Sequence, residues 1–139
     1  MIITTINDLA TIPTYAHADD SGMDLCSTEE LIINPGNRAL IGTGLTIELD
    51  PLTEAQVRPR SGLAYNHGIT VLNSPGTIDE GYRGEIKVLL VNLSDEWFKV
   101  TVGMKIAQLV IAPIIRPDIL VARQTERGDN GFGSTGLVS

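Results

Sequence analysis

Short apolar runs, separated by Gly, Pro, Asn or Asp, follow one another along the chain. Thr46–Asp50 and Phe98–Val102 alternate apolar with polar residues, which is the period of a strand with one buried face. Val88–Val91 and Leu109–Ile111 are continuous apolar runs, which indicates strands buried on both faces. The pattern predicts strands near Ile2–Thr5, Met23–Ser27, Glu30–Ile33, Ala39–Leu49, Ala55–Arg60, Ile69–Asn73, Glu85–Leu93, Trp97–Val102, Lys105–Ile114 and Ile119–Gln124.

Turn signals such as Asn34–Gly36, Ser74–Gly76 and Arg116–Asp118 recur about every ten residues. Many short strands at this spacing predict an all-β domain, as a sandwich, a jelly roll or a barrel. Only Ser61–Tyr65 has the pattern of a helix, a short one with Ser61 as its cap. The sequence shows no internal repeat and no second domain.

The composition narrows the class of protein. With 139 residues, 42% of them hydrophobic, the chain is long and apolar enough for one domain with its own core. The net charge of −7 argues against general nucleic-acid binding, because an acidic surface repels phosphate backbones. It leaves room for a small phosphorylated ligand where basic residues cluster.

The single cysteine and the lack of targeting patterns bear on the cellular compartment. Cys26 is the single cysteine and cannot form a disulfide within the chain, which favours a reducing environment. The sequence contains neither a signal-peptide pattern nor an apolar run long enough for a membrane span. We therefore expect a soluble, cytoplasmic protein with no membrane partner.

The last thirteen residues, 127–139, contain four glycines, Arg127, Phe132 and the hydroxyls of Ser134 and Thr135. Such a segment is commonly a frayed end. Its inventory also suits an anionic ligand with a flat ring, because glycines let backbone N–H groups approach phosphate oxygens while Arg and Phe supply a planar fork and a stacking face.

Four internal clusters also combine polar residues in unusual ways. Asp24 stands between Met23 and Leu25, which fits an exposed strand carboxylate or one placed for a metal-bound water or a cation. The run from Arg58 to Ala64 fits a surface turn or an anion cradle.

The other two clusters are a hairpin and a polar strand residue. Asn73–Gly84 contains two turn signals around Thr77, Ile78 and Asp79, and a plain hairpin does not explain why Asn, Asp, Tyr and Arg gather there. Gln108 lies within an apolar strand and must hydrogen-bond either a neighbour or a ligand.

Together these clusters closely resemble the five ordered motifs of the homotrimeric dUTP pyrophosphatases, the dUTPases. The motifs are SGMDL at 21–25, PRSGLA at 59–64, NSPGTIDEGYRGE at 73–85, GMKIAQL at 103–109 and RGDNGFGSTG at 127–136. They stand in family order and span nearly the whole chain. The resemblance implies a distorted jelly-roll β-barrel over residues 1–124 and a flexible glycine-rich C-terminal arm over residues 125–139. It also implies a homotrimer whose active sites are shared between subunits, each arm closing over a neighbouring site.

The resemblance implies an activity as well. Enzymes of this family hydrolyse dUTP to dUMP and pyrophosphate with Mg²⁺ as cofactor, which keeps uracil out of DNA and supplies dUMP for thymidylate synthesis. Water attacks the α-phosphorus, and Asp79 would orient and deprotonate it while holding the sugar 3′-hydroxyl. Tyr82 would lie beneath the deoxyribose and exclude a 2′-hydroxyl. Asn73 and the backbone of Thr77, Ile78 and Asp79 would read the edge of uracil.

The remaining roles concern the phosphates and the metal. Ser61 would act near the α–β bridge, and Asp24 would reach Mg²⁺ through bound waters. Lys87 matches a position next to the nucleotide. The other implied phosphate ligands and arm residues are Arg60, Gly62, Gln108, Arg127, Gly133, Ser134 and Thr135, with Phe132 stacking on uracil.

Two alternatives remain at this point. A dCTP deaminase of the same superfamily would carry a catalytic glutamate where this chain has Leu89, and a further arginine where Ala64 and Tyr65 stand, so both differences favour a dUTPase. A nucleotide-sensing regulator that uses the same fold to bind an unknown protein partner is not excluded by any sequence feature.

Overall fold

The computed structural model describes residues 1–121, which form eleven strands and one helix. The elements are β1 (Ile2–Thr5), β2 (Met23–Cys26), β3 (Leu31–Ile33), β4 (Arg38–Gly42), β5 (Leu45–Glu48), β6 (Thr53–Arg58), α1 (Ser61–His67), β7 (Ile69–Val71), β8 (Gly76–Ile78), β9 (Lys87–Asn92), β10 (Phe98–Val100) and β11 (Lys105–Pro113).

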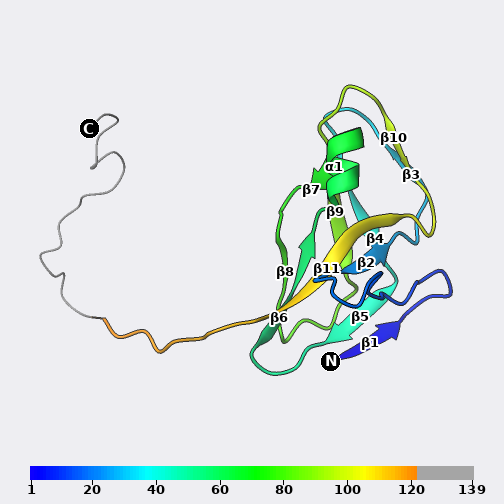
Figure 1. Ribbon diagram of the computed structural model, residues 1–139. Coiled ribbons are helices and arrows are strands. Elements are labelled where there is room, and N and C mark those ends of the chain that lie inside the picture. Colours follow the sequence, from blue (N-terminus) through cyan, green and yellow to red (C-terminus); the bar gives the residue numbers. More distant parts are fainter. Residues whose placement is uncertain (122–139) are drawn as a thin grey trace, which may run out of the picture.

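The strands pair in four antiparallel sheets (Figure 1). The largest has the order β2-β11-β6-β8, and a second has the order β4-β9-β7. Two-stranded sheets, β1-β5 and β10-β3, complete the barrel. Neighbours in a sheet are mostly distant in sequence, so segments from all parts of the chain meet in the largest sheet.

The core inside these sheets is aliphatic, which fits a chain with only 4% aromatic residues. Leu25, Ile41, Val88, Ala107 and Leu109 have no measurable exposure. Burial of Leu, Ile and Val side chains from nearly every strand holds the sheets together, at about 1.5–3 kcal/mol for each fully buried side chain.

The all-β prediction is confirmed, and most predicted strands are present with ends that differ by a few residues. The predicted strand Ala39–Leu49 is two strands instead, because the chain turns between Gly42 and Gly44. Gly44 has φ +68°, a left-handed backbone that favours glycine, and the buried Thr43 hydroxyl donates to the Ile86 carbonyl at 2.6 Å.

Three local predictions are wrong. The segment predicted as a hairpin, 73–84, is not two paired strands: Gly76–Ile78 is the edge strand β8, which pairs with β6, and residues 79–86 form a loop. We refer to residues 73–85 as the hairpin segment, or hairpin. The helix is longer than predicted, and Ser61 is its first residue rather than its cap, since Arg60 occupies the N-cap without a side-chain hydrogen bond. Residues 119–121 form no strand, and residues 122–124 of that predicted strand lie outside the described part of the chain.

After β11 the chain leaves the body of the molecule, seen as the orange segment in Figure 1. Ile115, Ile119, Leu120 and Val121 on this segment are 88–97% exposed. Over the residues that the structure describes, no helix has the length and apolar character that crossing a bilayer requires.

Candidate active site

The hairpin predicted to hold the base and sugar borders a cavity of about 320 Å³. Five of the predicted site residues line it, together with three others. The lining residues are Leu40, Thr77, Ile78, Asp79, Tyr82, Glu85, Ile86 and Lys87.

Pairing of β8 with β6 positions the backbone of this hairpin. Thr77 lies opposite Gln56 and Ile78 opposite Ala55. Ile78 is buried, whereas Thr77 and Asp79 are exposed on either side of it, as strand alternation requires. The ladder ends at Ile78, so Asp79 is the first residue beyond it.

Tyr82 is held by its neighbours although it is 44% exposed. Its hydroxyl donates to the Glu85 carbonyl at 2.9 Å. A Cβ at Gly84 would lie 2.5 Å from the Tyr82 hydroxyl oxygen, so the ring rests where only a glycine permits it. The ring forms one wall of the cavity, and its hydroxyl is held by the hydrogen bond to the Glu85 carbonyl.

Glu85 connects this cavity to the β4–β5 turn. Its Oε1 accepts the Gly44 N–H at 2.9 Å, and its Oε2 lies 3.8 Å from Lys87 Nζ. Lys87 thereby keeps its ammonium at the cavity edge, half exposed.

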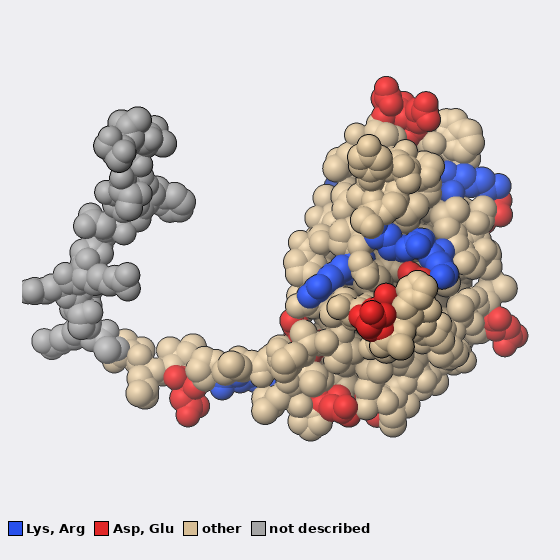
Figure 2. All heavy atoms as spheres, viewed as in Figure 1, with Lys and Arg blue, Asp and Glu red and all other residues tan. Residues whose placement is uncertain are grey.

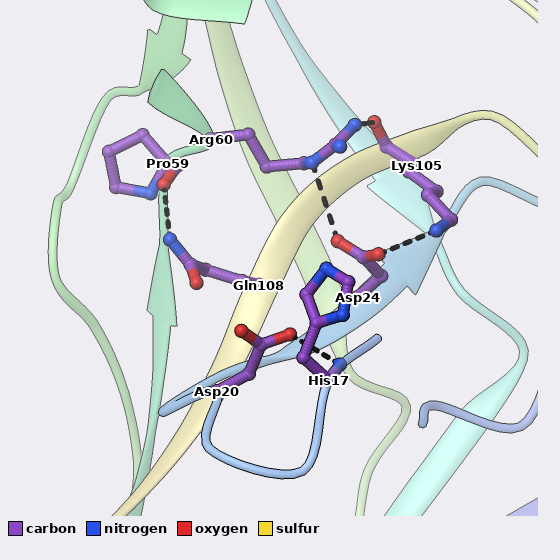
Figure 3. A network of polar contacts seen from close by, with 7 residues as sticks. All are labelled: His17, Asp20, Asp24, Pro59, Arg60, Lys105 and Gln108. Atoms are coloured by element: carbon purple, nitrogen blue, oxygen red, sulfur yellow. Dashed lines mark hydrogen bonds and ion pairs between the residues drawn. The ribbon is translucent and has the colours of Figure 1, made fainter. Parts of the chain in front are cut away.

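A second group of predicted residues forms a polar network on β2, β11 and the segment that enters α1 (Figure 3). Asp24 Oδ2 lies 2.7 Å from Lys105 Nζ, and Asp24 Oδ1 lies 3.4 Å from Arg60 Nε. Arg60 also donates from Nη1 to the Lys105 carbonyl at 2.9 Å. One carboxylate thus holds two cations side by side.

Gln108 belongs to the same end of the sheet. Its amide nitrogen donates to the Pro59 carbonyl at 3.0 Å (Figure 3). A Cβ at Gly22 would lie 2.5 Å from Gln108 Oε1, so Gly22 leaves the space that this amide occupies. The side-chain oxygen has no protein donor among the described hydrogen bonds of Gln108.

Basic side chains gather on this face over β11, with acidic atoms beside them (Figure 2). Their presence on a chain with net charge −7 agrees with the prediction that cations cluster locally.

Ser61 and Gly62 follow Arg60 directly and are exposed at the start of α1. A Cβ at Gly62 would meet no atom within 4 Å, so the space in front of it is open in a single chain. Asn73 does not line the hairpin cavity. Its side chain lies near Gly76, where a Cβ would stand 3.4 Å from Asn73 Nδ2.

The two groups occupy opposite corners of the largest sheet. Asp24, Gln108 and Arg58 are at one level across β2, β11 and β6, whereas Ile78 on β8 is level with Ala55. Three strand spacings across and four residues along put the backbones of Asp24 and Asp79 up to about 20 Å apart, measured along the sheet. A single chain does not bring all predicted site residues together.

Residues 1–121 contain no group of three or more His, Cys, Asp or Glu side chains arranged to hold a metal ion. Asp24 is 22% exposed, and its two ion pairs leave lone pairs free to accept hydrogen bonds from water. The Asp24 carboxylate could therefore accept hydrogen bonds from the bound waters of a cation that is held mainly by another ligand.

Arg127, Phe132, Gly133, Ser134 and Thr135, the predicted residues of the arm, lie outside the described part of the chain. A further cavity of about 350 Å³ between α1 and the loop before β10 contains none of the predicted residues.

The dUTPase family model matches residues 8–136. Deoxyuridine 5′-triphosphate nucleotidohydrolase from Clostridium kluyveri is 58% identical over 99% of this chain and 99% of its own length. The chain belongs to the dUTPase family. The prediction made from the five motifs is confirmed.

Solved structures of dUTPases share the fold. The Staphylococcus bacteriophage 80alpha dUTPase with dUPNHPP has a TM-score of 0.85 and 25% identity, and the alignment covers 98% of each chain. The dUTPase from phage phi11 of S. aureus, described with a coordinated structural Mg(II) ion, has a TM-score of 0.82 and 22% identity over 90% of this chain and 97% of its own. The predicted jelly-roll barrel is confirmed, and the dCTP deaminase alternative is not favoured.

Sequence reasoning assigned no role to Lys105, Glu80 or Glu85, although all three lie within the quoted motifs. Lys105 pairs with Asp24, and Glu85 lines the cavity. Glu80 accepts the Leu52 N–H at 3.1 Å and pairs with Arg116 Nη1 at 2.8 Å. The hydrogen bond from Leu52 and the Arg116 guanidinium hold the pKa of Glu80 below its ordinary value. Only tertiary contacts reveal these partners.

Proposed function

We propose that this member of the dUTPase family hydrolyses dUTP to dUMP and pyrophosphate, which keeps uracil out of DNA and supplies dUMP for thymidylate synthesis. The observation that carries the proposal is the hairpin cavity, where an exposed carboxylate, Asp79, stands beside the Tyr82 ring. The 58% identity to a deoxyuridine 5′-triphosphate nucleotidohydrolase, over nearly the full length of both chains, supports dUTP as the substrate.

Uracil would bind at β8. The backbone groups of Thr77 and Ile78 are fixed in direction by the ladder with β6, and the Asn73 side chain lies close by. Cytosine has a different pattern of donors and acceptors, so it would leave buried groups unpaired at about 1–3 kcal/mol each. This supports selection of uracil at the base.

Asp79 would act as general base. Its carboxylate would accept a proton from the water that attacks the α-phosphorus and a hydrogen bond from the 3′-hydroxyl. A positioned general base contributes about 10²–10⁴ in rate. Tyr82 would contact the sugar, and its ring would leave no room for a 2′-hydroxyl.

The polar network would bind the phosphates. Arg60 uses Nε and Nη1 within the network, which leaves further N–H donors for anionic oxygens. Ser61 and Gly62 would contact the α and β phosphates in the open space before α1, and Gln108 would contribute at the margin. Lys87, at the edge of the hairpin cavity, would lie next to the nucleotide.

The Asp24 carboxylate would contact Mg²⁺ only indirectly. Bound to the triphosphate, the ion would neutralise part of its charge, and Asp24 would hold the ion's waters rather than the ion itself.

The distance of up to about 20 Å along the sheet between the hairpin and the polar network supports a shared site. We propose a homotrimer in which the hairpin of one subunit faces the phosphate-binding residues of another. Residues 1–124 would form the barrel. Residues 125–139 would form an arm in which Arg127, Gly133, Ser134 and Thr135 close over the phosphates and Phe132 stacks on uracil.

One assay tests the activity. The protein is incubated with Mg²⁺ and dUTP, dCTP, dTTP or UTP separately, and the products are identified. We expect dUMP and pyrophosphate from dUTP alone, whereas deamination of dCTP would support the deaminase alternative instead.

Replacing the base tests the mechanism. Asp79→Asn keeps the shape of the side chain but removes the proton acceptor, so kcat should fall about 10²–10⁴-fold. Binding of a non-hydrolysable dUTP analogue should stay measurable. Near-normal turnover by this variant would exclude Asp79 as the base.

A further inference from the structure

The position of Asp79 depends on what holds the chain on each side of it. On its N-terminal side, the ladder between β8 and β6 fixes Gly76, Thr77 and Ile78 and then ends. On its C-terminal side the chain turns at once, since the Tyr82 N–H donates to the Asp79 carbonyl at 3.0 Å. Farther along, Glu85 attaches the loop to the barrel by accepting the Gly44 N–H, but it lies six positions after Asp79.

Glu80 supplies the missing anchor. Its Oε2 accepts the backbone N–H of Leu52 at 3.1 Å and lies 2.8 Å from Arg116 Nη1. Leu52 belongs to the turn between β5 and β6, so the contact ties the loop after β8 to the strand next to β8. Arg83 strengthens the loop itself by donating to the Glu80 carbonyl at 2.8 Å.

The partner of this anchor is unusual. Leu52 has φ +58°, the one positive φ at a non-glycine residue within residues 1–121. A left-handed backbone is unfavourable at such a residue, because its Cβ comes too close to the following carbonyl oxygen. Two hydrogen bonds hold Leu52 itself: Glu80 accepts its N–H, and Ile114 donates to its carbonyl at 2.9 Å. The Thr53 hydroxyl closes the same turn by donating to the Asp50 carbonyl at 2.6 Å. Strain that surrounding contacts maintain is common near functional sites.

We propose that Glu80 is a positioning residue of the active site, which sets Asp79 against the α-phosphorus by fixing the loop after β8 to the Leu52 backbone. This inference rests on the proposed function and deepens it. Base recognition lies on the other side of Asp79, in the β8 ladder, so loss of the anchor affects the chemical step more than nucleotide binding. Arg116 orients the Glu80 carboxylate and is secondary.

Three variants distinguish the hydrogen bond from Leu52 to Glu80 from the ion pair between Glu80 and Arg116. Glu80→Ala removes both contacts, Glu80→Gln keeps an oxygen that can accept the Leu52 N–H, and Arg116→Met removes the charge partner alone. The control is Glu30→Ala, because Glu30 forms a similar exposed ion pair with Lys99 at 2.8 Å away from the site residues.

We expect Glu80→Ala to lower kcat for dUTP about tenfold, since misplacement of a reacting group by about 1 Å costs up to 10²-fold. The dissociation constant of a non-hydrolysable dUTP analogue should change less than about twofold. The melting temperature should change by less than about 2 °C, because Arg116 is exposed and Glu80 is only partly buried. Glu80→Gln should recover most of the lost kcat, and Arg116→Met and Glu30→Ala should stay near the parent value.

Unchanged kcat in Glu80→Ala would overturn the proposal. So would a Glu80→Gln variant as slow as Glu80→Ala, or a Glu80→Ala variant whose analogue binding and melting temperature fall along with kcat. Failure of the parent protein to hydrolyse dUTP is a separate result, which would contradict the proposed function itself.

Discussion

Tyr82 owes the position of its ring to two neighbours, Gly84 beneath it and the Glu85 carbonyl that its hydroxyl contacts. If this ring excludes the 2′-hydroxyl, Tyr82→Ala should relax discrimination between dUTP and UTP by about tenfold or more. The measurement is the ratio of kcat/KM for the two nucleotides.

Two further variants show whether the ring or the hydroxyl matters. Tyr82→Phe keeps the ring and should keep most of the discrimination. Gly84→Ala should displace the ring, since its Cβ would lie 2.5 Å from the tyrosine oxygen, and should resemble Tyr82→Ala. Full rejection of UTP by both Tyr82→Ala and Gly84→Ala would place the selectivity elsewhere.

Gly22 shows how a residue without a side chain can matter for a site. In Gly22→Ala, the new methyl would meet Gln108 Oε1 at 2.5 Å and push the amide from the Pro59 carbonyl. Because the amide is the end of a flexible side chain, the fold should tolerate the change. KM for dUTP should rise by about 2–10-fold, the cost of roughly one hydrogen bond.

A double-mutant cycle tests the cause. Gly22→Ala introduced into a Gln108→Ala background should produce no further rise in KM. Additive effects would mean that Gly22 acts through the backbone and not through Gln108.

Among residues, the sequence indicated which side chains carry chemistry but not their contacts. For Asp24 the sequence leaves open an exposed strand carboxylate or one placed for a metal-bound water or a cation, and the structure shows two cations beside it. The importance of Lys105, Glu80 and Glu85 could not be predicted, because each has a partner at least 28 positions away in the chain, which no local pattern identifies.

At the scale of elements, we expect the segment after residue 125 to contribute to activity but little to stability. Within residues 1–121, the buried core side chains all precede Ile111. Deleting residues 126–139 should therefore leave the melting temperature within about 2 °C of the full chain. Turnover should fall by about 10² or more, because closure over the phosphates would be lost.

The matched control is a shorter deletion of residues 137–139, which removes the end of the chain but keeps the motif at 127–136. It should retain nearly full activity. An active enzyme without residues 126–139 would mean that the arm has no part in catalysis.

Secondary structure is predicted well where the hydrophobic pattern is strong. It is predicted poorly where a glycine fits either a turn or a closely packed strand. The runs that became β9 and β11 were predicted because continuous apolar residues leave few alternatives. Gly76 belongs to a turn signal in the sequence, yet it starts β8, because a glycine lets this edge strand approach Val57 of β6 closely. Its ideal Cβ would lie 3.2 Å from Val57 Cβ.

At the scale of the whole molecule, the separation between Asp79 and Arg60 permits a decisive test of the shared site. Asp79→Asn and Arg60→Ala should each be nearly inactive alone. If a site takes Asp79 from one subunit and Arg60 from another, trimers reassembled from an equal mixture should regain about a quarter of the parent activity, as random combination in a cyclic trimer gives.

The control is the double variant, with both substitutions on one chain, mixed with an equal amount of the parent protein. It should give the same fraction of intact sites by the same arithmetic, which calibrates the reassembly. No recovery from the two single variants, with recovery in the control, would place the whole site within one subunit.

By itself the sequence determined the all-β class, the aliphatic core and the family, because period, composition and five ordered motifs are local properties of the chain. Tertiary structure decided which of these motifs meet. Antiparallel pairing places β2 and β8 on opposite edges of one sheet, so SGMDL and the hairpin, only about 50 residues apart in sequence, lie at different corners of the molecule. The order of strands in a sheet depends on the apolar surface that all strands bury together, so it cannot be predicted from a single motif.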